Sequence, residues 1–221
     1  EVVDFRQNSD EQILWTNSMF SGMPTDQISR KYEGTWLAEG LTKLIRFGLP
    51  TPIFFLFVYF ISFYILALSL RMKPITGIIG SVAFGLSSYF IVILEAGHNS
   101  KAAAIGLAPL MIAGFILAYR KKNWILGVAL ASLFMMVELA ANHVQITYYM
   151  AIIMVLMGVV ELLRHVKENQ LPKFFKVTGA LALGYVLAVM VNYGNLFGTL
   201  DYAKQTIRGG TELTINADGT P

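Results

Sequence analysis

Side chains that can take part in acid–base chemistry gather in two short polar segments of the chain. Residues 95–101 contain Glu95 and His98, and residues 138–145 contain Glu138 and His143. Carboxylates and imidazoles are the groups that most often move protons near neutral pH. Glu95 and His98 are three residues apart, which predicts that one helix face carries both. We therefore predict four candidate catalytic residues: Glu95, His98, Glu138 and His143.

A second set of side chains has the chemistry to bind a phosphorylated sugar. Lysine and arginine attract phosphate, whereas asparagine, glutamine and tryptophan offer hydrogen bonds or a ring face to a sugar. The predicted binding residues are Trp15, Asn17, Asn99, Lys101, Asn142, Gln145, Lys204 and Arg208. The alternatives are a capping or interfacial role for the histidines and asparagines, and a plain surface charge for the cations.

The same residues bear on metal binding. Glutamate and histidine are metal ligands, but the sequence has no cysteine and no pair of histidines four residues apart. The sequence therefore assigns no metal ligands, and a divalent metal stays an open alternative as cofactor. Glu138 lies about one helical turn inside the end of an apolar stretch, where a carboxylate needs a proton or a cationic partner. We expect Lys101 or His98 to be that partner.

The elements that position these residues are long apolar stretches. The chain is 55% hydrophobic, has a mean hydropathy of +0.57 and is only 14% charged, against roughly 25% charged residues in a soluble domain. Stretches of 18–21 residues span roughly 27–31 Å as helices, close to the thickness of a bilayer core. The sequence predicts an all-α, polytopic transmembrane helical bundle of about six spans, at 51–70, 75–94, 102–119, 124–141, 146–163 and 177–197.

The basic residues between the stretches predict an orientation. Alternate connectors hold nine of them: Arg71, Lys73, Arg120, Lys121, Lys122, Arg164, Lys167, Lys173 and Lys176. The other connectors hold only Lys101. Lysine and arginine concentrate in cytoplasmic loops, so both polar segments and both ends of the chain are expected to be extracytoplasmic. This placement of charge argues against nucleic acid as a partner.

Both terminal segments are predicted to lie outside the membrane core. In residues 1–50, apolar positions of 35–47 alternate with Glu39, Lys43 and Arg46, which favours an amphipathic helix on the membrane surface over a helix in a globular loop. Residues 198–221 are expected to begin another extracytoplasmic loop. We expect the sequence to be cut at both ends, with at least one helix before Glu1.

Four short motifs resemble signatures of the YfhO-type bacterial membrane proteins, especially those of Bacteroidota. They are LWTNSMFSGMP at 14–24, AGHNSK at 96–101, ANHVQITYY at 141–149 and RGGTEL at 208–213. The motifs run in the expected order and extend over nearly all of the chain.

The resemblance implies an integral membrane glycosyltransferase of the GT-C type in the bacterial inner membrane. Such an enzyme moves a sugar from a polyprenyl-phosphate carrier to a cell-surface glycan or polymer at the outer face, in contact with membrane lipids. In that class an acidic residue of the first outer loop acts as general base or metal ligand. That position is expected before Glu1, since Asp4 does not match it, so this fragment alone is expected to be inactive.

Two other functions remain open from the residues themselves. A transporter or permease would use Glu138 with His98 or His143 as a proton or ion relay. Against it, no charged residue lies at the middle of any apolar stretch, and no pair of broken helices marks a central site. A non-catalytic membrane subunit is the third possibility.

Overall fold

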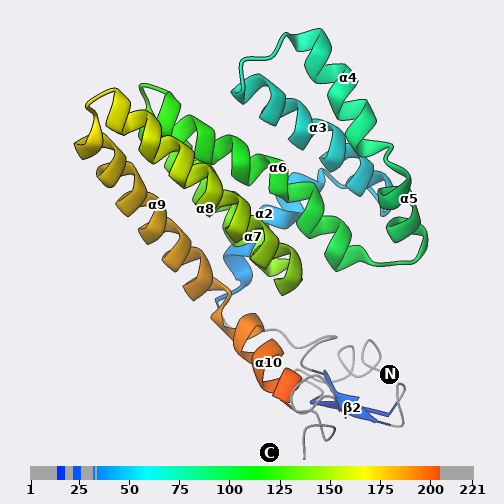
Figure 1. Ribbon diagram of the computed structural model, residues 1–221. Helices are drawn as coiled ribbons and strands as arrows, with labels where there is room; N and C mark the ends of the chain where they lie inside the picture. The colour runs from blue at the N-terminus through cyan, green and yellow to red at the C-terminus, as the bar shows by residue number, and fades with distance from the viewer. Residues whose placement is uncertain (1–13, 18–21, 26–31, 33, 205–221) are drawn as a thin grey trace, which may run out of the picture. The chain divides into compact units, whose positions relative to one another are not determined.

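The computed structural model describes residues 14–17, 22–25, 32 and 34–204. Within these residues the chain is all-α apart from one small antiparallel ribbon, which confirms the predicted class (Figure 1). The ribbon pairs β1 (Trp15–Thr16) with β2 (Met23–Pro24). The helices are α2 (Trp36–Arg46), α3 (Ile53–Ser69), α4 (Pro74–Gly85), α5 (Ser88–Glu95), α6 (Asn99–Arg120), α7 (Trp124–Ala140), α8 (Val144–Lys167), α9 (Leu171–Val191) and α10 (Tyr193–Lys204).

The chain divides into two compact units. One consists of residues 36–192 and holds α2 to α9; the other joins residues 1–35 to 193–221 and holds β1, β2 and α10. The predicted stretch 177–197 therefore covers most of α9 and the first residues of α10.

Within the described part of the chain, three helices are long and apolar enough to cross a membrane: α6 with 22 residues, α8 with 24 and α9 with 21. Helices α4 and α5 add a fourth crossing if they are counted as one broken span, which bends by 43°. The chain is therefore a membrane protein with several membrane-spanning helices.

This count differs from the six spans that the sequence predicts. The stretch 75–94 is broken because Gly85 ends α4 and Ser87 adopts an extended ψ of 131° before α5 begins; glycine and serine are poor helix formers. Helices α3 and α7 have 17 residues each, which is short for a bilayer crossing of about 20 residues. Hydrophobicity alone located all of these helices, but it did not reveal the break or the shorter lengths.

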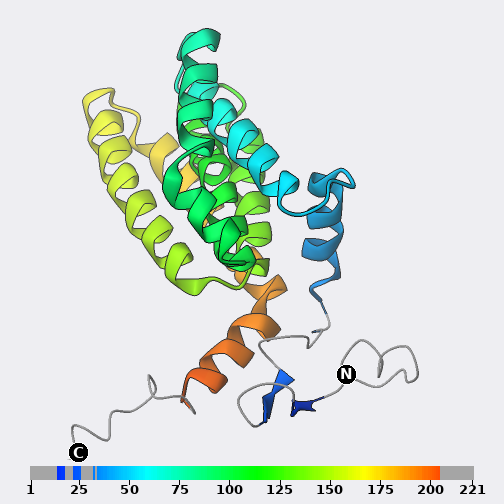
Figure 2. The ribbon, with the colours of Figure 1, turned by 90° about the vertical axis from the view of Figure 1, so that its right-hand side faces the viewer.

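Helix α6 is the centre of the larger unit. Of its most apolar window, 78% is buried, against 17% and 22% for α8 and α9. Figure 1 shows the α3–α4 hairpin on one side of α6 and α8 and α9 on the other. Figure 2 shows the unit turned by 90°, with α8 at one edge and α2 at the other. Most side chains of α8 and α9 are consequently left to face lipid.

Helices α6 and α7 approach each other through glycine. A Cβ atom on Gly127 would overlap the backbone of Ala118, and one on Gly114 would lie 2.7 Å from the Cα atom of Ala131. Ala118 and Ala131 are themselves fully buried. Small residues of this kind let helix backbones pack closely where lipid provides no hydrophobic drive for association.

We expect Gly127→Ala to lower the free energy of unfolding by about 1–3 kcal/mol, because the added methyl group overpacks the α6–α7 contact. Gly158→Ala is the matched control, since a Cβ there meets nothing within 4 Å; it should raise the stability by about 0.5 kcal/mol through helix propensity. Equilibrium unfolding in mixed micelles measures both. Equal effects of the two substitutions would contradict the close approach.

Candidate functional site

The turn between α7 and α8 sets the positions of Glu138 and His143. Helix α7 ends at Ala140, and Asn142 adopts a left-handed conformation with φ +53°. Asparagine tolerates this conformation better than most residues and commonly ends a helix. The backbone N–H of Asn142 donates to the carbonyl of Leu139 at 3.0 Å. Helix α8 then starts at Val144 and returns past the end of α7.

Glu138 is fully buried and is bound by α8 rather than by a cation. The hydroxyl oxygen of Thr147 lies 3.0 and 3.1 Å from the two carboxyl oxygens. The predicted partners were Lys101 or His98, but neither forms an ion pair with Glu138 in the described part of the chain. A buried carboxyl group is tolerated only when it is hydrogen-bonded, and here a neutral hydroxyl satisfies it.

His143 immediately precedes α8, and the surroundings of its side chain lower its pKa. Its carbonyl accepts a hydrogen bond from the N–H of Ile146 at 2.9 Å, whereas its Nδ1 is buried and forms no hydrogen bond within the described residues. Burial is the largest influence and lowers the pKa of His143; an interaction with its own backbone raises that pKa, and the charges of Lys101 and His98 lower it. The structure therefore brings the two polar connectors together. His98, Lys101 and His143 are called the His–Lys group below.

The other members of the His–Lys group come from the start of α6. Helix α5 ends at Glu95, and Gly97 turns the chain with φ +73° before α6 begins at Asn99. Glu95 and His98 thus lie on different elements, which corrects the expectation of one shared helix face. Lys101 lies over the ring of Tyr89, with Nζ 5.3 Å from its centre.

The remaining predicted site residues at this end of the bundle differ in their exposure to solvent. Glu95, His98 and Asn99 are exposed, and Lys101 is half-buried. Gln145 is also exposed and donates through Nε2 to the hydroxyl of Tyr149 at 2.7 Å. The exposed carboxylate of Glu95 is open to solvent, whereas the carboxyl of Glu138 is closed off from it. The two glutamates therefore cannot act as an equivalent pair in this conformation.

Three of the predicted binding residues that the structure describes belong to the smaller unit. The indole Nε1 of Trp15 donates to Oδ1 of Asn17 at 3.0 Å. Lys204 Nζ lies 3.7 Å from Oδ1 of Asp201, and both side chains are exposed. Arg208 lies outside the described residues. The contacts of Trp15, Asn17 and Lys204 are therefore local to their own segments.

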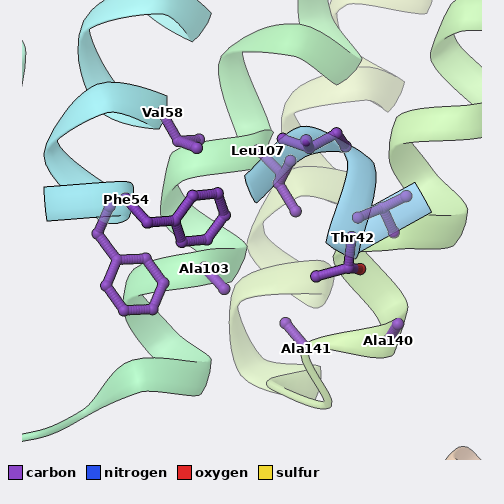
Figure 3. A pocket seen from close by; sticks show the side chains of 10 residues that line it. Thr42, Phe54, Val58, Ala103, Leu107, Ala140 and Ala141 are labelled. Carbon is purple, nitrogen blue, oxygen red and sulfur yellow. The ribbon is translucent and has the colours of Figure 1, made fainter. Parts of the chain in front are cut away.

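An apolar cavity of about 90 Å³ lies between α2, α3, α6 and α7 (Figure 3). Ala103 in its wall is two residues after Lys101, and Ala141 directly precedes Asn142. The cavity therefore adjoins the end of the bundle that carries the His–Lys group. Its other lining residues are Thr42, Ile45, Phe54, Phe55, Val58, Leu107, Val137 and Ala140. Sequence reasoning missed this cavity, because its wall is assembled from four separate helices.

Sequence reasoning also missed a buried ion pair at the opposite end of the bundle. Glu161 is 2% exposed, and its Oε1 lies 2.7 Å from Nε of Arg120. Its Oε2 lies 3.2 Å from NH1 of Arg164. The available signal was a single glutamate inside the apolar stretch 146–163, whereas the arginines alone were interpreted as orientation signals.

Among the described residues, no group of three or more histidine, aspartate or glutamate side chains is placed to hold a metal ion. No family model matches the chain, and no curated protein or solved structure is significantly similar to it. This end of the bundle combines basic side chains, an imidazole with a lowered pKa and an adjoining apolar cavity. That combination suits a ligand with an anionic head and an aliphatic tail.

We predict that the pKa of His143 lies below 6.5, the ordinary value of histidine. The unfolded state then binds more protons, so stability should fall as the pH drops below about 6.5 toward the lowered value. Lys101→Gln should move this pKa upward, because a neighbouring positive charge is removed. Lys122→Gln, beyond the 17-residue helix α7, should leave it unchanged, since about 25 Å of helix separates them. Histidine NMR titration measures these shifts; an unaltered pKa in Lys101→Gln would contradict the arrangement.

Proposed function

We propose that the chain forms part of a GT-C-type membrane glycosyltransferase that transfers a sugar from a polyprenyl-phosphate carrier to a cell-surface glycan or polymer. The observation that carries the proposal is the His–Lys group beside the apolar cavity. A polyprenyl phosphate has an anionic head and a long hydrocarbon tail, and this end of the bundle offers matching chemistry for both. The four YfhO-like motifs support the same function.

Lys101 is the proposed phosphate ligand. It forms no ion pair with a carboxylate within the described residues. Its contact with the ring of Tyr89 leaves the ammonium group able to bind an anion. His98 is exposed beside it and adds positive charge when protonated. Together they would stabilise the phosphate as it leaves the sugar.

His143 is the proposed general base. Its lowered pKa keeps the imidazole neutral near pH 7, and the side chain as a whole is only half-buried. In the proposed step the acceptor hydroxyl attacks the anomeric carbon and gives its proton to this imidazole. The bond from that carbon to the phosphate oxygen breaks, and the phosphate leaves with the electron pair. Buried Glu138 holds α7 against α8 beneath His143 through Thr147.

The proposed setting is the bacterial inner membrane, with the His–Lys group at the extracytoplasmic face. Helices α3 and α7, at 17 residues, fall at the lower end of the range for spanning helices. We propose that they cross the bilayer as well, which restores six crossings. The basic connectors then face the cytoplasm, as the distribution of lysine and arginine indicates.

Sugar transfer by the full-length protein tests the function. With a radiolabelled polyprenyl-phosphate hexose, His143→Ala should lower kcat by about 10²–10⁴-fold, the usual contribution of a general base. Lys101→Gln should raise the KM for the lipid-linked donor about tenfold. Lys122→Gln, which removes an equal charge at the other end of α7, should be unaffected. Transfer at the wild-type rate by both His143→Ala and Lys101→Gln would overturn the proposal.

A further inference from the structure

The end of the bundle away from the His–Lys group contains a larger cavity, of about 370 Å³. Its wall comes from the α3–α4 connector, the ends of α6 and α8, and the residues that directly follow them. These are the connectors with the excess of basic residues, and Figure 1 shows the α3–α4 and α8–α9 connections at the same end of the bundle. The basic residues in the wall are Arg71, Arg120, Lys121 and Arg164. This space is called the basic cavity below.

The basic cavity has more positive charge than its carboxylates neutralise. Glu161 pairs with Arg120 and Arg164, and Glu168 Oε1 lies 3.3 Å from Nε of Arg164. Arg71 and Lys121 form no ion pair within the described residues. Four cations against two carboxylates leave two positive charges without a paired carboxylate among the described residues.

The buried carboxylate of Glu161 orients an arginine at this cavity. Arg120 binds Glu161 through Nε, and its side chain is 39% exposed. Its two terminal nitrogens form no hydrogen bond to another described residue. A guanidinium group fixed in this way keeps donors free in the geometry that suits a phosphate oxygen.

Arg71 adopts a left-handed backbone conformation that arginine does not favour. Its φ is +62°, two residues after the end of α3, where the N–H of Met72 closes the helix on the carbonyl of Ala67 at 3.1 Å. Glycine is the favoured residue for this conformation; the other positive φ values next to described helix ends belong to Phe47, Gly48, Gly97, Asn142 and Asn169. Orientation in the membrane requires only that a basic residue be somewhere in the connector. It does not explain an arginine at the strained position beside a cavity.

We propose that the basic cavity binds a phosphate-bearing anion, supplied either by the headgroup of an anionic phospholipid or by free phosphate. Arg71 and Lys121 supply the uncompensated charge, and Arg120 supplies oriented donors. Leu70, Ile116 and Leu117 line the same space and provide apolar contact of the kind that a lipid glycerol backbone needs. Basic pockets between membrane helices on the cytoplasmic side are a general mode of lipid headgroup recognition. This site is separate from the proposed transfer site.

A pair of double variants tests this proposal in the full-length protein. Arg71→Gln with Lys121→Gln removes the two uncompensated charges from the cavity wall. Lys73→Gln with Lys122→Gln is the matched control, because it removes two charges from the same connectors at residues that do not line the cavity. The probes are dioleoylphosphatidylglycerol, followed by native mass spectrometry with dioleoylphosphatidylcholine as reference, and inorganic phosphate, followed by calorimetry.

The cavity variant should bind at least one probe about ten- to thirtyfold more weakly than the wild type. The control variant should stay within about twofold of the wild type. Binding of the lipid without competition by inorganic phosphate identifies a headgroup site, and binding of inorganic phosphate identifies a site for the free anion. An equal loss in both variants, no loss in either, or no binding of either probe to the wild type would overturn the proposal.

Arg71→Gly separates loss of the anion from loss of the fold. Glycine relieves the left-handed strain, so the melting temperature without probe should rise by about 2–4 °C. Affinity for the probe should fall about fivefold at the same time. A variant that is more stable and binds as tightly as the wild type would show that Arg71 has no part in the site.

Discussion

The packing of α6 against α7 is the contact on which the rest of the larger unit depends. Gly114 and Gly127 bring the two backbones together at a separation that a methyl group would prevent. The antiparallel pair then fixes the ends of both helices. Lys101 and His143 lie near enough at one end for the lysine charge to lower the pKa of the histidine, whereas Arg120 and Lys121 line a cavity at the other. Helices α3 and α9 pack on opposite members of this pair, so the remaining connectors follow the same division (Figures 1 and 2).

The two ends differ in how their charge is balanced. At the His–Lys group, a carboxyl is buried but bound to the Thr147 hydroxyl, so the nearby cations are not neutralised by it. At the basic cavity, Glu161 is paired directly with arginines, yet more cations surround it than it can neutralise. Among the described residues, both ends consequently keep basic side chains that form no ion pair, beside apolar surface. Each is suited to the polar head of a lipid, and the bundle separates the two by the length of its helices.

Much of the architecture could be predicted from the sequence, because hydrophobic stretches and basic connectors are local signals. Hydrophobicity located α3 to α9, although α10 extends into residues predicted as a loop. The spacing of basic residues placed Arg71, Lys121 and Arg164 at one end, where they line one cavity. The break after Gly85 was missed because an apolar composition continues through it. The predicted cationic partner of Glu138 was wrong, because the hydroxyl of Thr147, one turn into the next helix, binds the carboxyl group instead. The Glu161 pairs and the apolar cavity depend on contacts between distant segments, which spacing along the chain does not encode.

We propose that the polar connectors and the basic connectors lie on opposite sides of a membrane, with the polar ones outside the cytoplasm. The chain has no cysteine, so single cysteines can be labelled without background from it. Asn99 and Lys122 are exposed members of the two classes of connector. In intact cells, a membrane-impermeant maleimide should label Asn99→Cys but should label Lys122→Cys only after the membrane is permeabilised. Labelling of both from the same side, or the reverse order, would contradict the account.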